Sequence, residues 1–146
     1  MTLATHNPVL KGLFLLLFSL LLSVSAQAAP SHKLVIQVNT ADPETQALAL
    51  NNAVNVQKDL GVDNVAIEVV AYGPGLSLLT KQSTQAERVE SLAMQDITFS
   101  ACGNTMKKIA EKTGKEPQLI DGVTVVPAGV IRIMELQEQG YAYIRP

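Results

Sequence analysis

The chain alternates short apolar, β-branched segments with longer amphipathic ones, and this alternation narrows the possible folds more than any other feature. Segments rich in Val and Ile predict strands, whereas apolar residues spaced three and four apart predict helices. Apolar strands that are each followed by a helix are typical of a parallel sheet covered on both faces. We therefore predict an α/β fold: one three-layer α/β/α domain with a mostly parallel five-stranded sheet. The predicted strands are residues 33–38, 64–72, 97–101, 123–126 and 141–144.

Polar residues mark the expected starts of three helices. Asp42 precedes Pro43, a pair that suits the N-cap and the first helical position. Thr84 and Glu87 have the spacing of a capping box, in which each side chain bonds to a backbone N–H group of the other residue. Asn104 is the expected cap of the helix after the third strand. These residues predict helices over 43–60, 84–93 and 104–113.

A proline and a glycine mark the ends of the fourth predicted helix. Pro127 follows the fourth strand and suits a first helical position, while Gly140 is typical of a C-terminal stop. Between these two residues, we expect Val130, Ile131 and Met134 to point inward, toward the sheet.

The N-terminal segment has the pattern of an export signal. Lys11 supplies positive charge, residues 13–24 form an apolar run, and Ala26 and Ala28 match a small-residue cleavage site. The alternative is a membrane anchor, but about 12 apolar residues fall short of the roughly 20 that a spanning helix needs. We expect cleavage near Ala28 and a periplasmic location, with the mature domain, residues 29–146, not attached to the membrane.

Charge and cysteine content exclude several classes of protein. The net charge is −2 and the sequence has no basic cluster, which argues against nucleic-acid binding. Cys102 is the only cysteine of the sequence, so the chain has no internal disulfide although export is predicted. A single cysteine in an exported protein indicates intermolecular pairing or a free reactive thiol. The alternative is an inert thiol that packs in the core as a small apolar side chain.

Cys102 lies at a predicted strand-to-helix turn. A thiol there faces free backbone N–H groups and the positive end of the helix dipole, which stabilise a thiolate and lower the thiol pKa. In open α/β sheets, ligands bind outside the carboxyl ends of the strands, and the loops after the first two strands end at the same edge if the three strands are neighbours. Cys102 is the candidate catalytic residue, and the candidate binding residues are Asn39, Gly73, Gly75, Gly103 and Asn104.

Three other chemistries find little support in the sequence. A hydrolase would need a base beside the thiol, but His32 precedes the first strand and is expected at the opposite end of the sheet. The aspartates are scattered and suit caps and turns better than a metal site. Gly73 and Gly75 follow a strand, but Leu78 stands where a dinucleotide loop has its third glycine. We therefore predict no metal and no cofactor.

A thiol without its own base suits a group carrier. A thiolate can accept a sulfane sulfur or form a mixed disulfide and then pass it on, which depends on thiolate fraction and access rather than on a catalytic triad. Lys107 and Lys108 lie one turn into the following helix. These lysines either add positive potential at the thiol or simply form the solvent face of the helix.

Four segments together resemble the DsrE/DsrF-like family. The resemblance spans residues 33–146 and implies a compact α/β/α domain that often assembles into oligomers. In the sulfur-relay members, a cysteine in this loop region carries persulfide between partner proteins, and Cys102 matches that cysteine. Those members work in the cytoplasm, so an exported chain needs a different donor and acceptor. The segments are residues 50–53 (LNNA), 70–75 (VAYGPG), 101–106 (ACGNTM) and 139–146 (QGYAYIRP).

These observations lead to two hypotheses of different classes. The first is a periplasmic sulfur carrier or thiol-redox protein that holds persulfide or a mixed disulfide on Cys102. Its partners are sulfur donor and acceptor proteins or small sulfur species; it is a homo-oligomer and, as an enzyme, at most a sulfurtransferase-like carrier. The second is a non-catalytic module that binds a small ligand or a protein, with Cys102 merely packed. A weaker third possibility is an enzyme that borrows a base, such as His32, from a neighbouring subunit.

Overall fold

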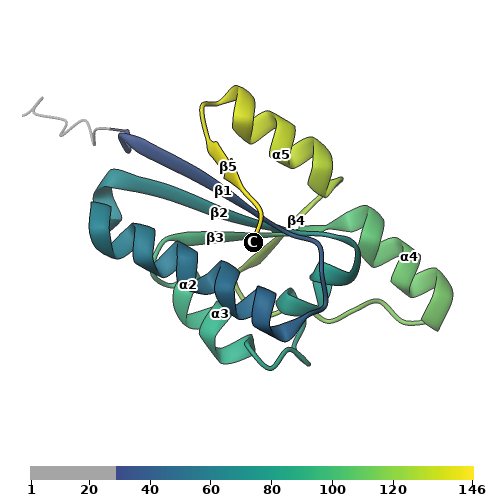
Figure 1. Cartoon of the computed structure of the whole chain (residues 1–146). Helices are drawn as coiled ribbons and strands as arrows, with labels where there is room; N and C mark the ends of the chain where they lie inside the picture. Colours follow the sequence, from purple (N-terminus) through teal and green to yellow (C-terminus); the bar gives the residue numbers. More distant parts are fainter. Residues whose placement is uncertain (1–28) are drawn as a thin grey trace, which may run out of the picture.

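The computed structural model describes residues 29–146, so the predicted export signal, residues 1–28, lies outside the described residues. In the described part, β-strands and α-helices alternate along the chain as predicted (Figure 1). No helix in this part is long and apolar enough to cross a membrane. The strands are β1 (His32–Val38), β2 (Val65–Ala71), β3 (Ile97–Cys102), β4 (Val123–Val126) and β5 (Ala142–Ile144). The helices are α2 (Pro43–Leu60), α3 (Ala86–Ala93), α4 (Gly103–Thr113) and α5 (Gly129–Glu138), with the 3-10 helices η2 (Val62–Asn64) and η3 (Gly73–Leu79).

The five strands form one sheet in the order β4-β3-β2-β1-β5, and every neighbouring pair is parallel. Helices α2 and α3 cover one face of the sheet, and α5 covers the other (Figure 1). Helix α4 lies beyond the end of the sheet where β3 finishes (Figure 1). The predicted single α/β domain with helices on both faces is therefore confirmed.

The core is divided between the two faces of the sheet because side chains along a strand alternate in direction. Ile36 points toward α2 and α3 and belongs to the larger buried cluster, which also holds Phe99. Its neighbour Val35 points the other way and packs with Ile133 and Leu136 of α5. Burying each such side chain stabilises the fold by about 1.5–3 kcal/mol relative to exposure.

Two of the predicted helix starts have opposite outcomes. Asp42 is the N-cap of α2, and its Oδ2 atom accepts the Thr45 backbone N–H at 2.7 Å. Hydrogen bonds from the hydroxyl and the N–H of Thr45 lower the pKa of Asp42. The predicted capping box at Thr84 is wrong, because α3 has Gln85 as its N-cap and no side-chain cap. Ser83 forms a local turn there instead, its Oγ atom accepting the Gln85 N–H at 3.1 Å.

The predicted inward face of the fourth helix is also wrong. Val130, Ile131 and Met134 are 52%, 52% and 51% exposed. The helix begins at Gly129, two residues after Pro127, and packs on the sheet through a stripe spaced three and four apart. Apolar residues occur on both sides of this helix, so their spacing did not decide which side is buried. The stripe is Gly129, Arg132, Ile133 and Leu136.

Candidate functional site

Strands β1, β2 and β3 are adjacent and parallel, so the loops that follow them meet at one edge of the sheet. This arrangement confirms the expected convergence of the three loops. Asn39 follows β1, Gly73 opens η3 after β2, and Cys102 ends β3. Cys102 is paired in register with Val126, the last residue of β4. The loop from β4 to α5 therefore also reaches the thiol, which the sequence did not predict.

Cys102 is the N-cap of α4; its side chain forms no capping hydrogen bond but lies near groups that lower its pKa. The residue is only 5% exposed. Burial raises the thiol pKa, but donors from the Thr105 hydroxyl and from the backbone N–H groups of Gly129, Thr105 and Asn104 outweigh it, so the pKa is lowered. These donors stabilise the thiolate because each places a partial positive charge at the sulfur.

Two helix N-termini meet at this sulfur. Asn104 and Thr105 belong to the first turn of α4, whereas Gly129 is the first residue of α5. The N-terminal N–H groups of a helix have no partner within the helix and carry the positive end of its dipole. The sequence predicted the contribution of α4 but missed that of α5, because that helix was expected to begin at Pro127.

Gly129 allows α5 to approach the site closely. A Cβ atom on Gly129 would lie 3.1 Å from the Tyr72 Cβ atom and 3.4 Å from the Cys102 Cβ atom. The first of these distances is tighter than ordinary van der Waals contact, so a side chain there would push the N-terminus of α5 away from the thiol. Gly129 was not among the predicted site residues; its place just after a strand and a proline is the only sequence signal for it.

The Thr105 hydroxyl joins two loops of the site. Its Oγ1 atom accepts the Gly73 backbone N–H at 2.9 Å and donates toward the Cys102 sulfur. Gly73 has a φ angle of +54°, a conformation that glycine adopts without a steric cost. The position of the loop after β2 is thus coupled to the hydrogen bonding of the thiol.

The other predicted binding residues occupy different positions. Gly75 is buried, and a Cβ atom on it would lie 2.2 Å from the Val38 carbonyl oxygen. Gly103 is similarly close to β4, with 3.2 Å from its Cβ position to the Val126 oxygen. Both glycines therefore permit close packing of backbone around the site. Asn39 is half-buried and follows β1, two strands away from β3.

Asn104 does not cap α4, because Cys102 occupies the N-cap position and Asn104 lies inside the first turn. The Asn104 side chain is exposed, and its backbone N–H donates to the Pro127 carbonyl at 3.2 Å. A residue in the first turn contributes its N–H group rather than its side chain to a site at the helix end. Because the Asn104 N–H is bonded to Pro127, it contributes least among the groups that lower the pKa of Cys102.

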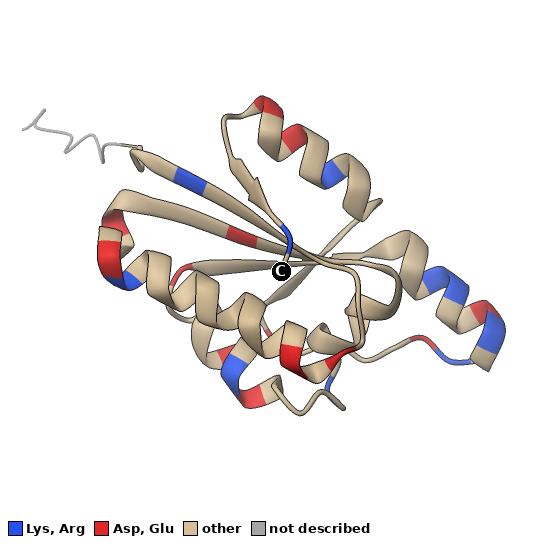
Figure 2. Cartoon of the chain, in the orientation of Figure 1, with Lys and Arg blue, Asp and Glu red and all other residues tan. Residues whose placement is uncertain are grey.

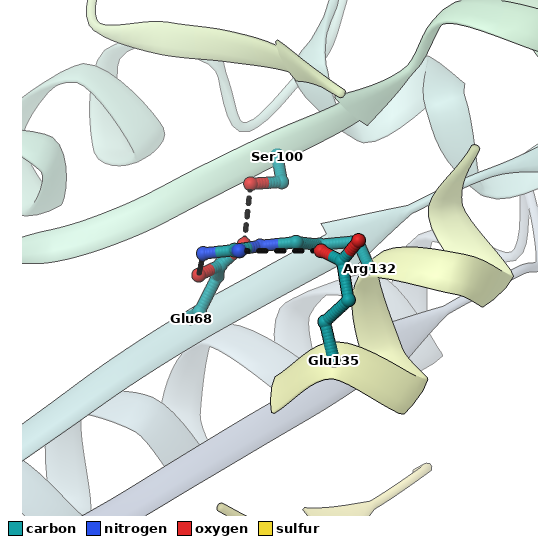
Figure 3. A network of polar contacts seen from close by, with 4 residues as sticks. All are labelled: Glu68, Ser100, Arg132 and Glu135. Atoms are coloured by element: carbon teal, nitrogen blue, oxygen red, sulfur yellow. Dashed lines mark hydrogen bonds and ion pairs between the residues drawn. The ribbon is translucent and has the colours of Figure 1, made fainter. Parts of the chain in front are cut away.

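A partly buried ion pair between Arg132 and Glu68 holds α5 on the sheet, one turn from Gly129 (Figure 3). Arg132 donates to both carboxylate oxygens of Glu68, from Nε at 2.8 Å and from Nη2 at 2.7 Å. Ser100 of β3 donates its hydroxyl to the same carboxylate at 2.6 Å, and Glu135 lies 3.6 Å from the Arg132 guanidinium. This two-pronged geometry sets both the distance and the rotation of α5.

The sequence reasoning missed this network, although Glu68 was visible as the one charged residue inside an otherwise apolar strand. A carboxylate in such a strand needs a partner, because an unpaired buried charge is costly. Its partner Arg132 is 64 residues away in the sequence, so no local pattern links them.

Other catalytic arrangements are not assembled around the thiol. His32 begins β1, whereas Cys102 ends β3, so the two residues lie at opposite ends of parallel strands. Within residues 29–146, no three His, Cys, Asp or Glu side chains are grouped so that they could hold a metal ion. What the described residues do assemble is a thiol surrounded by hydrogen-bond donors.

The fold and the site define a class: a parallel five-stranded α/β domain with a thiol at the carboxyl edge of its sheet. The profile of the DsrE/DsrF-like family matches residues 32–146, and the chain belongs to this family. A protein of unknown function from Methanobacterium thermoautotrophicum, MTH1491, has a similar structure, with a TM-score of 0.71 and 35% sequence identity. The match covers 79% of this chain and 99% of that protein. No match was found among curated proteins.

Proposed function

We propose that this protein is an exported sulfur carrier that holds sulfane sulfur as a persulfide on Cys102. Membership in the DsrE/DsrF-like family relates the chain in general terms to sulfur relay. The observation that carries the proposal is the position of Cys102: it is the N-cap of α4, and the Gly129 end of α5 lies beside it, with a Cβ position 3.4 Å from the Cys102 Cβ atom. The Thr105 hydroxyl and nearby backbone N–H groups lower the pKa of Cys102 there. A cysteine that only fills space in an apolar core needs no such donors, whereas a thiolate nucleophile does.

The proposed reaction is a transfer between sulfur atoms. The Cys102 thiolate attacks the outer sulfur of a donor persulfide, R–S–SH. A sulfur–sulfur bond forms between Cys102 and the outer sulfur while the sulfur–sulfur bond of the donor breaks, and R–S⁻ leaves as a thiolate. An acceptor thiolate then attacks the outer sulfur of the Cys102 persulfide and regenerates the Cys102 thiolate. Neither step consumes an oxidant or a reductant, and neither needs a histidine beside the thiol.

For Cys102 to carry sulfur, a donor must be able to reach its sulfur atom. Because Cys102 is 5% exposed, a donor reaches it only after a local movement of the surrounding loops. The movement has to be confined to the residues around Gly73, whose N–H is bonded to Thr105, because the rest of η3 is packed in the core through Leu76, Leu78 and Leu79. Local opening of this kind costs far less than unfolding the domain.

The proposed partners follow from the predicted export and from the surface. An exported carrier meets donors and acceptors of the periplasm, either proteins or small sulfur species. Helix α5 leaves Val130, Ile131 and Met134 about half-exposed on its side away from the sheet. Exposed apolar side chains that lie together are typical of association surfaces. We propose that a second copy of the chain covers this face.

The carrier hypothesis is tested by the intact mass of the protein purified from the periplasm. A mass gain of one or more sulfur atoms that disappears with reductant, and that is absent in Cys102→Ser, is the expected result. Recovery of the protein from the cytoplasm with its N-terminal segment intact would contradict the proposed export. A bare thiol that also resists polysulfide and alkylating reagents would contradict the carrier role.

The alternative is a module that binds a ligand or protein and uses no thiol chemistry. The low exposure of Cys102 favours it, since a packed cysteine is also buried. This alternative predicts that Cys102→Ser keeps both the fold and the biological effect, whereas the carrier proposal predicts that the fold is kept and the effect is lost.

A further inference from the structure

A cleft of about 640 Å³ lies between η3 and α4, next to the thiol site. Pro74 and Ser77 line it from η3, while Thr105, Lys108 and Lys112 line it from α4. Its volume is within the range of small-molecule sites, roughly 300–1,000 Å³. The Thr105 side chain belongs both to this cleft and to the donors around the sulfur, so the cleft and the site share a wall.

The cleft is lined by Lys108 and Lys112, and neither takes part in an ion pair formed within residues 29–146. Lys108 and Lys112 lie one helical turn apart, which brings their Cβ atoms to about 5–6 Å of each other. Among the described residues lining the cleft, none is acidic. Lys107 lies outside the cleft and pairs at 4.0 Å with Glu111. Figure 2 shows the basic residues of α4 at the end of the molecule that this helix forms.

The remaining walls of the cleft are mainly apolar. Tyr72 and Pro74 contribute from the loop after β2, Ile109 from α4, and Pro117 from the loop after α4. A ligand that fits this cleft has acidic groups for the two lysines and a carbon skeleton for the apolar walls. Inorganic sulfur species lack the carbon skeleton, and a folded protein donor is too large to enter.

We propose that this cleft binds a small organic persulfide that carries carboxylates, such as the persulfide of an acidic peptide. Its carboxylates pair with Lys108 and Lys112, and its sulfur lies at the Thr105 wall beside Cys102. This inference rests on the proposed carrier function and names the donor. The Cys102 thiolate takes the outer sulfur of this persulfide, and the rest of the donor leaves as a thiolate. The bonds formed and broken are those of the sulfur transfer described above.

The binding step is tested without any sulfur transfer, on the full chain with Cys102→Ser. The probe is S-methylglutathione, an unreactive acidic peptide with two carboxylates, and its dimethyl ester is the matched uncharged-carboxyl control. An NMR titration is expected to show saturable shifts in η3 and α4 with the acid and much weaker ones with the ester. Lys108→Ala with Lys112→Ala is expected to weaken binding on the order of tenfold, the effect of losing two exposed ion pairs.

Lys107→Ala is the control variant, because it removes one positive charge from the same helix outside the cleft. Equal affinity of the lysine double variant and Lys107→Ala, or no saturable binding of the acid, would overturn the inference. If polysulfide still loads Cys102 in that case, the carrier function stands and only the proposed donor is wrong. If the acid binds as expected but Cys102 cannot be loaded, the cleft is a binding site and the carrier function is wrong.

The approach of ligands from the cleft to the sulfur is tested by alkylation of the cysteine-containing chain. Iodoacetate is an anion and iodoacetamide is its neutral counterpart, so the ratio of their rates at Cys102 reports electrostatic attraction. The lysine double variant is expected to lower the iodoacetate rate several-fold and to leave the iodoacetamide rate unchanged. An unchanged ratio would show that Cys102 is not reached through this cleft, against the inference.

Discussion

At the scale of single residues, the central feature is a buried cysteine whose surroundings favour its charged form. Burial raises the pKa of the Cys102 thiol, and four donors lower it by more. A pKa below the usual value increases the thiolate fraction near neutral pH, and the thiolate is the reactive form. The site thus combines protection of the sulfur with activation of the sulfur, a combination that suits a protein that stores a labile group.

Thr105→Val is expected to raise the pKa of Cys102, because it removes the Thr105 hydroxyl, whose hydrogen bond lowers that pKa. The pH dependence of alkylation by iodoacetamide measures this pKa. The rate profile of the variant should shift to higher pH, since less thiolate is present at each pH below the new pKa. Thr105→Ser keeps the hydroxyl and should behave as wild type; a profile for Thr105→Val equal to wild type would contradict the account.

Gly75 was predicted to be a binding residue, but the structure shows that a glycine is needed there for close packing. Gly75→Ala would place a Cβ atom 2.2 Å from the Val38 oxygen, so the backbone must shift, and we expect a loss of about 2 kcal/mol or more of unfolding free energy. Gly73→Ala is the matched control, because its Cβ atom meets nothing within 4 Å and only its positive φ costs energy, about 1 kcal/mol. Urea denaturation measures both values, and a reversed order would contradict the packing explanation.

At the scale of elements, α5 is the part of the site that connects most directly to the rest of the fold. Its N-terminus brings Gly129 to the thiol, and its Arg132 is bound to Glu68 in the middle of the sheet. Arg132 is thus a positioning residue, which acts on the thiol through the helix that carries it. The N-terminus of α5 is therefore held at the sulfur by the pair of Arg132 and Glu68, although neither residue touches the sulfur.

Arg132→Met is expected to lower the unfolding free energy by about 3–5 kcal/mol, because it leaves the buried Glu68 carboxylate without its charged partner. In the chain that still folds, the pKa of Cys102 should also rise, since α5 is no longer held at the thiol. The combined variant Glu68→Gln and Arg132→Met should recover part of the stability but not the thiol pKa. Unfolding and alkylation profiles measure the two effects, and an Arg132→Met chain as stable as wild type would contradict this role.

The elements themselves were largely predictable from the sequence, because each strand is a local apolar run between turn residues. The two wrong caps, at Thr84 and Asn104, depend on backbone angles that the sequence alone does not determine. The side of α5 that faces the sheet depends on Glu68, a residue distant in the sequence. Cys102 could be identified as the candidate nucleophile because the strand before it and the helix after it are adjacent to it in the sequence. Gly129 could not be identified, because it reaches the thiol only through the pairing of β3 with β4.

At the scale of the whole molecule, one face of the domain is unusually apolar. Val130, Ile131 and Met134 of α5 are each about half-exposed, and we expect a homo-oligomer through this face. Val130→Glu with Ile131→Glu should yield monomers in light scattering after size exclusion, because charges in an apolar interface are unpaired. Met94→Glu is the control, since Met94 is 77% exposed and lies at the end of α3, on the other side of the sheet. A wild-type monomer at all concentrations would contradict this expectation.

The proposed carrier activity depends on the sheet, on two helices and on the cleft together. The sheet brings the loops to one edge, α4 and α5 direct N–H groups at one sulfur, and the cleft beside α4 offers lysines to an acidic donor. No single part suffices for a carrier, because a donor must bind, transfer its sulfur to a thiolate and leave. The claim on which the account depends is that Cys102 can hold a transferable sulfur atom.

The most direct test of that claim is intact-mass measurement of the purified protein after reaction with polysulfide. We predict a gain of sulfur on the wild-type chain, its loss on treatment with reductant or with an acceptor thiol, and no gain on Cys102→Ser. A wild-type chain that folds but gains no sulfur, or a Cys102→Ser chain that gains as much, would contradict the account.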